Sequence, residues 1–186
     1  MCDCNHDSIP FEPNQQENLI EYINMEHVKF LNAENGNTCV FLKDNEELIK
    51  SDCDDTMILQ IPFSSPIKLY EIHFIFSENQ SKHCLLFKNR VIDFEDDDSD
   101  LTIAQYRSNE QFYPVKQTIF NSTTLLMVYL KDNWLNNDQI ELQYIELRGT
   151  VVKSIKEPIV AMYEAAANPQ DHPSVISTSN KLGFQF

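Results

Sequence analysis

The sequence is poor in glycine, with only Gly36, Gly149 and Gly183 among 186 residues. Loops that cradle phosphates need several glycines, because the backbone must approach the phosphate closely. The scarcity therefore excludes P-loop and Rossmann nucleotide sites. Basic residues are also few, since 14 Lys and Arg stand against 29 Asp and Glu, for a net charge of −15. We expect neither nucleic acid nor a membrane as partner, because binding to phosphate backbones and anionic lipids depends on cationic side chains.

Long apolar runs and secretory features are missing as well. No segment approaches the roughly 20 apolar residues that span a bilayer. The N-terminus, Met-Cys-Asp-Cys-Asn-His-Asp, lacks the positive charge and apolar stretch of a signal peptide. The five cysteines are odd in number, irregularly spaced and without a Cys-x-x-Cys pair. We therefore expect reduced thiols and no thioredoxin-type redox centre, in a protein of the cytoplasm and nucleus.

What the sequence does contain is a succession of β-strand patterns. Apolar residues alternate over 57–63 and 67–76, and 125–130 is continuously apolar, as expected of a strand covered on both faces. Pro62 predicts an edge or a strand end, because proline cannot donate a ladder hydrogen bond, and Ser-Ser-Pro at 64–66 predicts a turn. Seven or eight strands without a strong amphipathic helix predict one all-β domain, an antiparallel β-sandwich or jelly roll. Further strands are expected at 84–87, 101–106, 113–120 and 139–152.

Two segments have less regular patterns. Within 139–152 the apolar phase changes, which predicts a β-bulge, because a bulge adds one residue to a strand. The expected faces are Ile140, Leu142 and Tyr144 on one side, with Ile145 and Leu147 on the other. Residues 19–31 fit either a short helix or an extended segment.

Three clusters of polar residues resemble metal sites only superficially. Within 93–100, six of eight residues are Asp or Glu, but the glycine and distal glutamate of a calcium-binding EF-hand loop are missing, so a solvated loop is favoured. At 51–55, a turn in which side chains accept from local amides is favoured over a ligand site. Cys2, Cys4 and His6 could hold zinc or copper, but their spacing is tight and a fourth ligand is lacking. We expect no metal and no cofactor.

No catalytic arrangement is expected either. The serines lack a Gly-x-Ser-x-Gly elbow, and His73 falls within a strand pattern, which favours a structural role. Trp134 lies in a predicted loop at 131–138. It is either a binding anchor or a cover for the end of the sandwich.

Residues 162–173, Met-Tyr-Glu-Ala-Ala-Ala-Asn-Pro-Gln-Asp-His-Pro, are the most distinctive segment. Pro169 disfavours a helical conformation for Asn168, which predicts a turn. Asp171 and His172 then either belong to a structured corner or form a catalytic pair. The corner is favoured, because such a pair becomes a site only when a third group orients it.

Three collinear parts of the sequence resemble the PITH domain, the proteasome-interacting module of a thioredoxin-like protein. They are Ser-Asp-Cys-Asp at 51–54 with the segments at 59–63 and 67–70, Tyr-Ile-Glu-Leu-Arg-Gly-Thr at 144–150, and Tyr-Glu-Ala-Ala-Ala-Asn-Pro-Gln-Asp-His at 163–172. Phe-Leu-Asn at 30–32 and the acidic segment at 93–96 agree with the same family. The resemblance covers 18–173, so we expect a flexible N-terminal tail at 1–17 and a C-terminal tail at 174–186.

The resemblance implies a jelly-roll sandwich similar to galactose-binding domains. The sequence shows no thioredoxin domain, so reductase activity does not carry over, and the chain is similar to stand-alone PITH proteins. We expect a monomeric, non-catalytic module that binds a protein partner with a basic surface, with the regulatory particle of the proteasome as candidate. The alternative is a module for a carbohydrate or peptide, in which Trp134, Tyr113 and Phe112 stack on a sugar. The predicted binding residues are Trp134, Tyr163, Glu164, Asn168, Asp171 and His172, and no catalytic residue is predicted.

Overall fold

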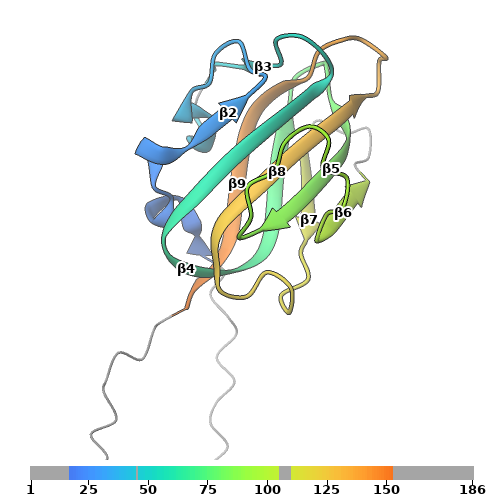
Figure 1. The fold of residues 1–186 in the computed structure, drawn as a ribbon. Helices are drawn as coiled ribbons and strands as arrows, with labels where there is room; N and C mark the ends of the chain where they lie inside the picture. The colour runs from blue at the N-terminus through green and yellow to red at the C-terminus, as the bar shows by residue number, and fades with distance from the viewer. Residues whose placement is uncertain (1–16, 45, 105–109, 153–186) are drawn as a thin grey trace, which may run out of the picture. The chain divides into compact units, whose positions relative to one another are not determined.

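One strand of 21 residues, β4 (Thr56–Phe76), organises the fold. The computed structural model describes residues 17–44, 46–104 and 110–152, all within the first of the two units into which the chain divides, Met1–Lys153. Within these residues the structure is an antiparallel β-sandwich without an α-helix (Figure 1). The other elements are β1 (Glu17–Asn18), β2 (Lys29–Leu31), β3 (Ile49–Lys50), β5 (Ser81–Lys88), β6 (Leu101–Ala104), β7 (Glu110–Pro114), β8 (Thr123–Asn133), β9 (Glu141–Val151) and the 3-10 helices η1 (Leu19–Tyr22), η2 (Met25–His27) and η3 (Thr38–Phe41).

Strand β4 belongs to both layers of the sandwich. Its first part pairs with β2 on one side and β8 on the other, and β8 continues to β5 and β6. Its second part pairs with β9 and β7, while β9 also pairs with β1 and β3. Figure 1 shows β4 curving from one layer into the other. The all-β, antiparallel sandwich predicted from the sequence is therefore confirmed.

The curve in β4 contains the proline and serines that predict a strand end and a turn. The predicted strand end and turn are wrong, because the strand continues without interruption through Pro62 and residues 64–66. The alternative for Pro62, an edge position, agrees with its place beyond Gln60, where the pairing with β2 ends. Pro62 is the last partner of β8, opposite Leu125, before the register shifts toward Ile67. Its carbonyl accepts from the backbone N–H of Asn24 at 2.8 Å. A residue without a backbone N–H is tolerated here because the regular hydrogen-bond ladder between β4 and β8 ends at this position.

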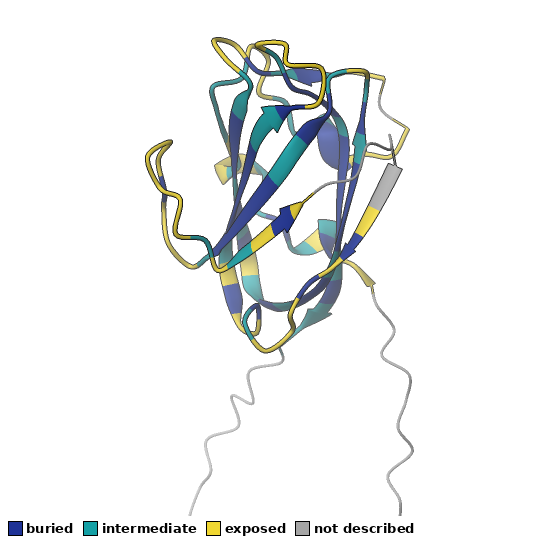
Figure 2. Cartoon of the chain, turned by 90° about the vertical axis from the view of Figure 1, so that its right-hand side faces the viewer, coloured by how far each residue is buried: buried dark blue, intermediate teal, exposed yellow. Residues whose placement is uncertain are grey.

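Strand β8 is buried on both faces, as its continuous apolar run predicts. Leu126, Val128 and Leu130 point into the main core between the layers. Met127 and Tyr129 belong to a second cluster, which includes Ile92 of the segment 89–100. Figure 2 shows the long strands of the sandwich largely buried, with exposed residues gathered mainly in the loops. Strands covered on both faces lack the usual alternation of apolar and polar residues. The rest of the second cluster is Ile58, Leu85, Phe87 and Ile92.

A register shift in β9 confirms the predicted bulge. Phe76 of β4 lies opposite Leu142, whereas the preceding Ile75 lies opposite Tyr144, so Gln143 is the additional residue. The bulge brings Ile145 into the same core as Leu142. The predicted faces are therefore wrong: the core side holds Ile140, Leu142, Ile145 and Leu147, and Tyr144 lies outside this cluster.

Other segments differ in extent from the predictions. The segment 19–31 contains both alternatives, because η1 and η2 precede the extended β2. The strand predicted at 113–120 ends at Pro114, since the backbone N–H of Phe120 turns back to the carbonyl of Lys116. None of the helices in the described part of the chain has the length and apolar character needed to cross a membrane. The candidate metal ligands Cys2, Cys4 and His6 and the segment 162–173 lie outside the described residues.

Candidate functional site

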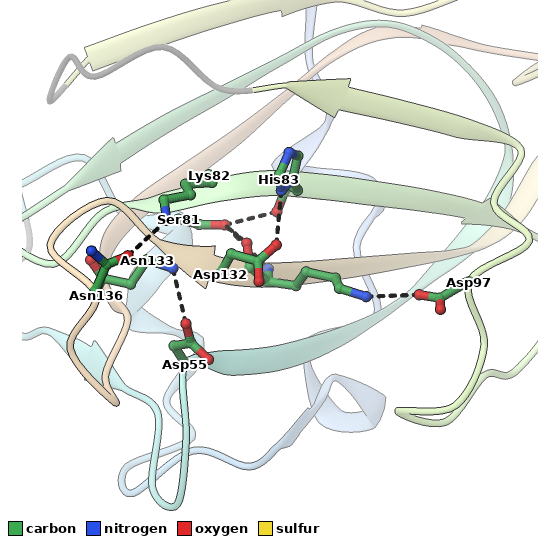
Figure 3. Close-up of polar contacts among 9 residues, drawn as sticks. Asp55, Ser81, Lys82, His83, Asp97, Asp132, Asn133 and Asn136 are labelled. Carbon is green, nitrogen blue, oxygen red and sulfur yellow. Dashed lines mark hydrogen bonds and ion pairs between the residues drawn. The ribbon is translucent and has the colours of Figure 1, made fainter.

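Strand β8 ends in a loop that carries Trp134, the only tryptophan of the chain. The buried Asn133 holds this loop through both its backbone and its side chain (Figure 3). Its backbone N–H donates to the carboxylate of Asp55 at 3.1 Å, and its Oδ1 accepts from the backbone N–H of Leu135 at 2.7 Å. Its Nδ2 donates to the carbonyl of Gln139. The start of the loop is therefore fixed to the sandwich at several points.

The indole of Trp134 is partly open to solvent. The residue is 37% exposed, and its backbone N–H donates to the carbonyl of Gln80 at 3.1 Å. The ammonium of Lys82 lies 5.9 Å from the ring centroid and also donates to Oδ1 of Asn136 at 3.1 Å. A positioned, accessible aromatic ring is suited to contact a partner. The role of Trp134 as a binding anchor remains a prediction.

Charged side chains surround the same end of β8. Oδ2 of Asp132 lies 2.9 Å from Nδ1 of His83 on β5, and Nζ of Lys131 lies 2.8 Å from Oδ1 of Asp97 (Figure 3). Together with the bond from Asn133 to Asp55, these contacts join the residue before β4, the segment 89–100 and strand β5 to the end of β8. We call this surface the β8 rim, and define it by Asp54, Asp55, Phe94, Asp97, Tyr129, Lys131, Asp132 and Trp134.

The electrostatics of the β8 rim are acidic. Burial raises the pKa of Tyr129, and although Lys131 opposes this effect, the charges of Asp97, Asp54 and Asp132 add to it. The pKa of Lys131 is itself raised, chiefly by its hydrogen bond to Asp97. Among the residues that define the rim, the carboxylates of Asp54, Asp55, Asp97 and Asp132 stand against the single ammonium of Lys131. The rim therefore presents negative charge to a partner.

The acidic segment 89–100 is a loop in the structure, as predicted. Its own amides bind its carboxylates, because Glu95 donates to Asp93 at 3.0 Å and Asp93 donates to Asp96 at 2.9 Å through their backbone N–H groups. Phe94 is 42% exposed and lies edge-on to Tyr129, with ring centroids 5.9 Å apart. Across residues 17–44, 46–104 and 110–152, no group of three His, Cys, Asp or Glu residues is arranged to hold a metal ion.

A second polar cluster lies on the layer formed by β4, β7 and β9. His73 is buried, stacks on Phe112 with centroids 3.8 Å apart, and places Nδ1 3.6 Å from Oε2 of Glu146. Tyr144 donates to the same oxygen at 3.2 Å, and Nε of Arg148 donates to Oε1 at 2.7 Å. Burial alone would raise the pKa of Glu146, but the hydrogen bond and charge of Arg148 outweigh it and hold that pKa below its usual range. A carboxylate stabilised in its charged form is a weak base, so the cluster suits a structural role.

The predicted sugar-stacking set is not assembled. Phe112 and Tyr113 are neighbours on β7, so their side chains point to opposite faces. Tyr113 is buried in the main core, whereas Phe112 is 45% exposed over His73. The prediction that Tyr113 joins Phe112 and Trp134 at a sugar is therefore wrong, because the Tyr113 side chain is buried in the core and not exposed beside them.

Two cysteines have thiols that are poorly suited to nucleophilic chemistry. The pKa of the exposed Cys53 is raised, first by the charge of Asp52. Burial raises the pKa of Cys84. Since the thiolate is the reactive form, neither of these cysteines is activated.

A cleft of about 470 Å³ opens beside η3 and β3. Across it, Nδ2 of Asn37 donates to Oε2 of Glu47 at 2.6 Å, and Oδ1 of Asn37 caps η3 by accepting from the backbone N–H of Cys39 at 3.0 Å. Ser51, directly after β3, exchanges hydrogen bonds with Ile140 at the end of the β8–β9 loop. Residues 49–51 therefore connect the cleft with the end of the β8–β9 loop. Its lining residues are Asn35, Asn37, Val40, Glu47, Leu48 and Ile49.

Comparison with known proteins decides the family. The profile of the PITH domain matches residues 9–167, most of the chain. The chain belongs to the PITH domain family. A PITH domain-containing protein of Schizosaccharomyces pombe is 28% identical over 197 residues, which cover 94% of this chain and 92% of the relative. PITH domain-containing protein 1 of Danio rerio is 29% identical and covers 88% of this chain and 84% of the relative.

Solved structures extend the comparison to the fold of this PITH protein. The C-terminal domain of a chitobiase from Bacteroides fragilis superposes with a TM-score of 0.51 at 18% identity, covering 67% of this chain and 92% of that chain. The CBM32-1 and CBM32-2 domains of ZmpB from Clostridium perfringens give a TM-score of 0.52 at 11% identity, covering 73% of this chain and 36% of that chain. At these identities the likeness concerns the fold alone. The fold is the jelly-roll sandwich of galactose-binding-like domains.

Of the predicted binding residues, the structure describes only Trp134. Tyr163, Glu164, Asn168, Asp171 and His172 lie outside the described residues. The β8 rim was missed, although the acidic segments 51–55 and 93–100 are conspicuous in the sequence. Only the pairing of β4, β5 and β8 brings these segments together.

Proposed function

We propose that this PITH protein is a non-catalytic interaction module that docks through the β8 rim on a protein partner with a basic surface. The observation that supports this proposal is the combination of exposed Phe94 and Trp134 with the carboxylates of Asp97 and Asp132. Aromatic side chains in fixed positions supply contact area, while opposite charges accelerate encounter and select the partner.

The family resemblance supplies a candidate partner, the regulatory particle of the proteasome. We place the module in the cytoplasm and nucleus, as a monomer that joins a larger assembly. Its relatives are named as domain-containing proteins, without an activity in the name. The lowered pKa of Glu146 and the raised pKa of Cys53 argue against a general base or a nucleophile at these positions.

Capture of partners from a cell lysate tests the proposal. The tagged full-length chain is used at low and at high salt, because salt screens charges beyond a Debye length of about 8 Å at physiological ionic strength. We expect a stable partner at low salt and a weaker yield at high salt. The double variant Asp97→Asn, Asp132→Asn should reduce capture about tenfold, and Phe94→Ala should reduce it further, since central aromatic contacts carry much of the binding energy.

A matched control distinguishes the effect of the rim carboxylates on binding from the effect of the net charge of the whole protein. The double variant Glu21→Gln, Glu26→Gln removes the same charge from exposed positions on η1 and η2, near the bend of β4. It should bind like the unmodified chain. Absence of every stable partner at low salt, or equal losses in the two double variants, would contradict the proposal.

Binding of a carbohydrate has weaker support. The similar solved structures include carbohydrate-binding modules by name, but their likeness concerns the fold, and the stacking set of Trp134 and Tyr113 does not form. A glycan array provides the test. Specific retention of a saccharide that Trp134→Ala abolishes would favour this function over protein docking.

A further inference from the structure

We infer that the cleft beside η3 receives a lysine or arginine side chain presented by the protein partner. This inference rests on the proposed function, because it specifies the chemistry of one contact with that partner. The cleft holds about 470 Å³, within the range of roughly 300–1,000 Å³ typical of ligand sites. It therefore has ample room for one long side chain.

The lining of the cleft matches the two chemical parts of such a side chain. Val40, Leu48 and Ile49 provide apolar surface. Lysine and arginine bury their methylene stems along such surface while the charged head seeks polar groups. Glu47 supplies a carboxylate, and Asn35 supplies an amide oxygen that can accept from an ammonium or guanidinium group.

The carboxylate is held in place before a ligand arrives. Asn37 donates to Oε2 of Glu47 at 2.6 Å, while its own oxygen caps η3. A carboxylate has about four acceptor sites, so it can accept from a cationic donor in addition to Asn37. Because the acceptor is already oriented, less conformational freedom is lost on binding.

Charges around the cleft favour a cation. Glu34, Asp44 and Glu46 are exposed on the segments that border it, against Lys43. Lys50, next to the lining residue Ile49, is neutralised by Glu141, with Nζ and Oε1 2.8 Å apart.

An anionic ligand would therefore meet unfavourable charge at this cleft. The adjoining β8–β9 loop also places the cleft within reach of a partner that docks on the β8 rim. Two hydrogen bonds between Ser51 and Ile140 connect the end of the β8–β9 loop with the residue that follows β3, next to the cleft.

The test is an NMR titration of the isotope-labelled full-length chain with capped tripeptides. The probes are acetyl-Gly-Lys-Gly-amide and acetyl-Gly-Arg-Gly-amide, with the norleucine analogue as the uncharged match for the lysine. At roughly millimolar peptide, we expect shifts of the amide signals of Asn35, Glu47 and Leu48 with the cationic peptides and much smaller shifts with norleucine. Glu47→Gln should weaken binding about tenfold, because hydrogen bonds between charged groups are the strong ones.

Two further variants make the result specific. Glu46→Gln removes the same charge from the neighbouring exposed position, which does not line the cleft, and should change the affinity less than about twofold. Asn35→Trp introduces a bulky side chain into the cleft from an exposed position and should abolish the shifts. The unchanged spectrum of β-strand amides verifies the fold of each variant.

Several outcomes would overturn the inference. They are a flat titration, equal binding by Glu47→Gln, or stronger shifts of the same residues with a chito-oligosaccharide. The inference and the proposed function fail separately. Capture that depends on the rim but survives Glu47→Gln contradicts the cleft, whereas binding of the peptides without any captured partner contradicts the proposed function.

Discussion

Replacement of Asn133 by alanine tests how the Trp134 loop is held. Asn133 is fully buried and uses both ends of its amide, toward Leu135 and Gln139. Asn133→Ala removes both hydrogen bonds while keeping the backbone bond to Asp55. It leaves the N–H of Leu135 and the carbonyl of Gln139 without these partners.

The size of the effect follows from these two bonds. An unsatisfied buried group costs about 1–3 kcal/mol. Leu135 is 41% exposed, so water replaces part of its lost bond. We therefore expect the free energy of unfolding to fall by about 2–3 kcal/mol. For a domain of this size, that corresponds to a melting temperature lower by roughly 5–10 °C.

Urea denaturation followed by circular dichroism measures the change in stability. Because the chain has one tryptophan, the emission of the native state reports on the loop alone. We expect a shift of this emission to longer wavelength in Asn133→Ala, since the indole becomes more hydrated. Asn137→Ala is the control, because Asn137 is exposed and bonds only to Asn79 at 2.9 Å in the described structure. A loss below about 0.5 kcal/mol in Asn133→Ala, no larger than a typical surface substitution, would refute the reasoning.

Three further predictions concern the rest of the sandwich. Gly149→Ala should lower the free energy of unfolding by about 3 kcal/mol or more in urea titrations, because its Cβ would lie 2.1 Å from a backbone carbonyl oxygen of β4. Glu146 has a lowered pKa, so its stabilising contribution is present above the ordinary glutamate pKa and is lost as pH falls through the lowered one. The destabilisation caused by Arg148→Met should therefore be smaller near pH 3 than near pH 7 in paired denaturation curves. Asp52→Asn should accelerate alkylation of Cys53 at neutral pH, measured by site-resolved mass spectrometry, because the charge of Asp52 raises that thiol's pKa.

Local sequence patterns predict those features that show directly in the order of apolar and polar residues along one strand. The two-sided burial of β8 follows from an apolar run that leaves no polar face to solvent. The bulge in β9 follows from a change of phase, since an added residue reverses which side chains point inward. The pattern could not show which residue was added. The assignment of Tyr144 to the same face as Ile140 and Leu142 therefore failed.

The path of β4 from one layer to the other could not be predicted from local sequence patterns. Pro62 and the serines after it have the composition of a turn, and only the pairing with β8 and then β9 shows that the chain crosses between layers there. The β8 rim is non-local for the same reason. Asp55, Asp97 and Asp132 are distant in sequence and meet through strand pairing and through contacts such as the bond from Asp55 to Asn133. The cleft beside η3 gave no sequence signal, because its asparagines and glutamate resemble any polar loop.

Cross-linking of the full-length chain to its captured partner tests the docking surface most directly. An amine-reactive cross-linker reports on Lys82 beside Trp134 and on Lys131 of the β8 rim, while Lys29 on β2 and Lys68 near the bend of β4 serve as internal references. The account predicts that intermolecular links concentrate at Lys82 and Lys131. Links concentrated at Lys29 and Lys68, with Lys82 and Lys131 free to react with small reagents in the complex, would contradict it.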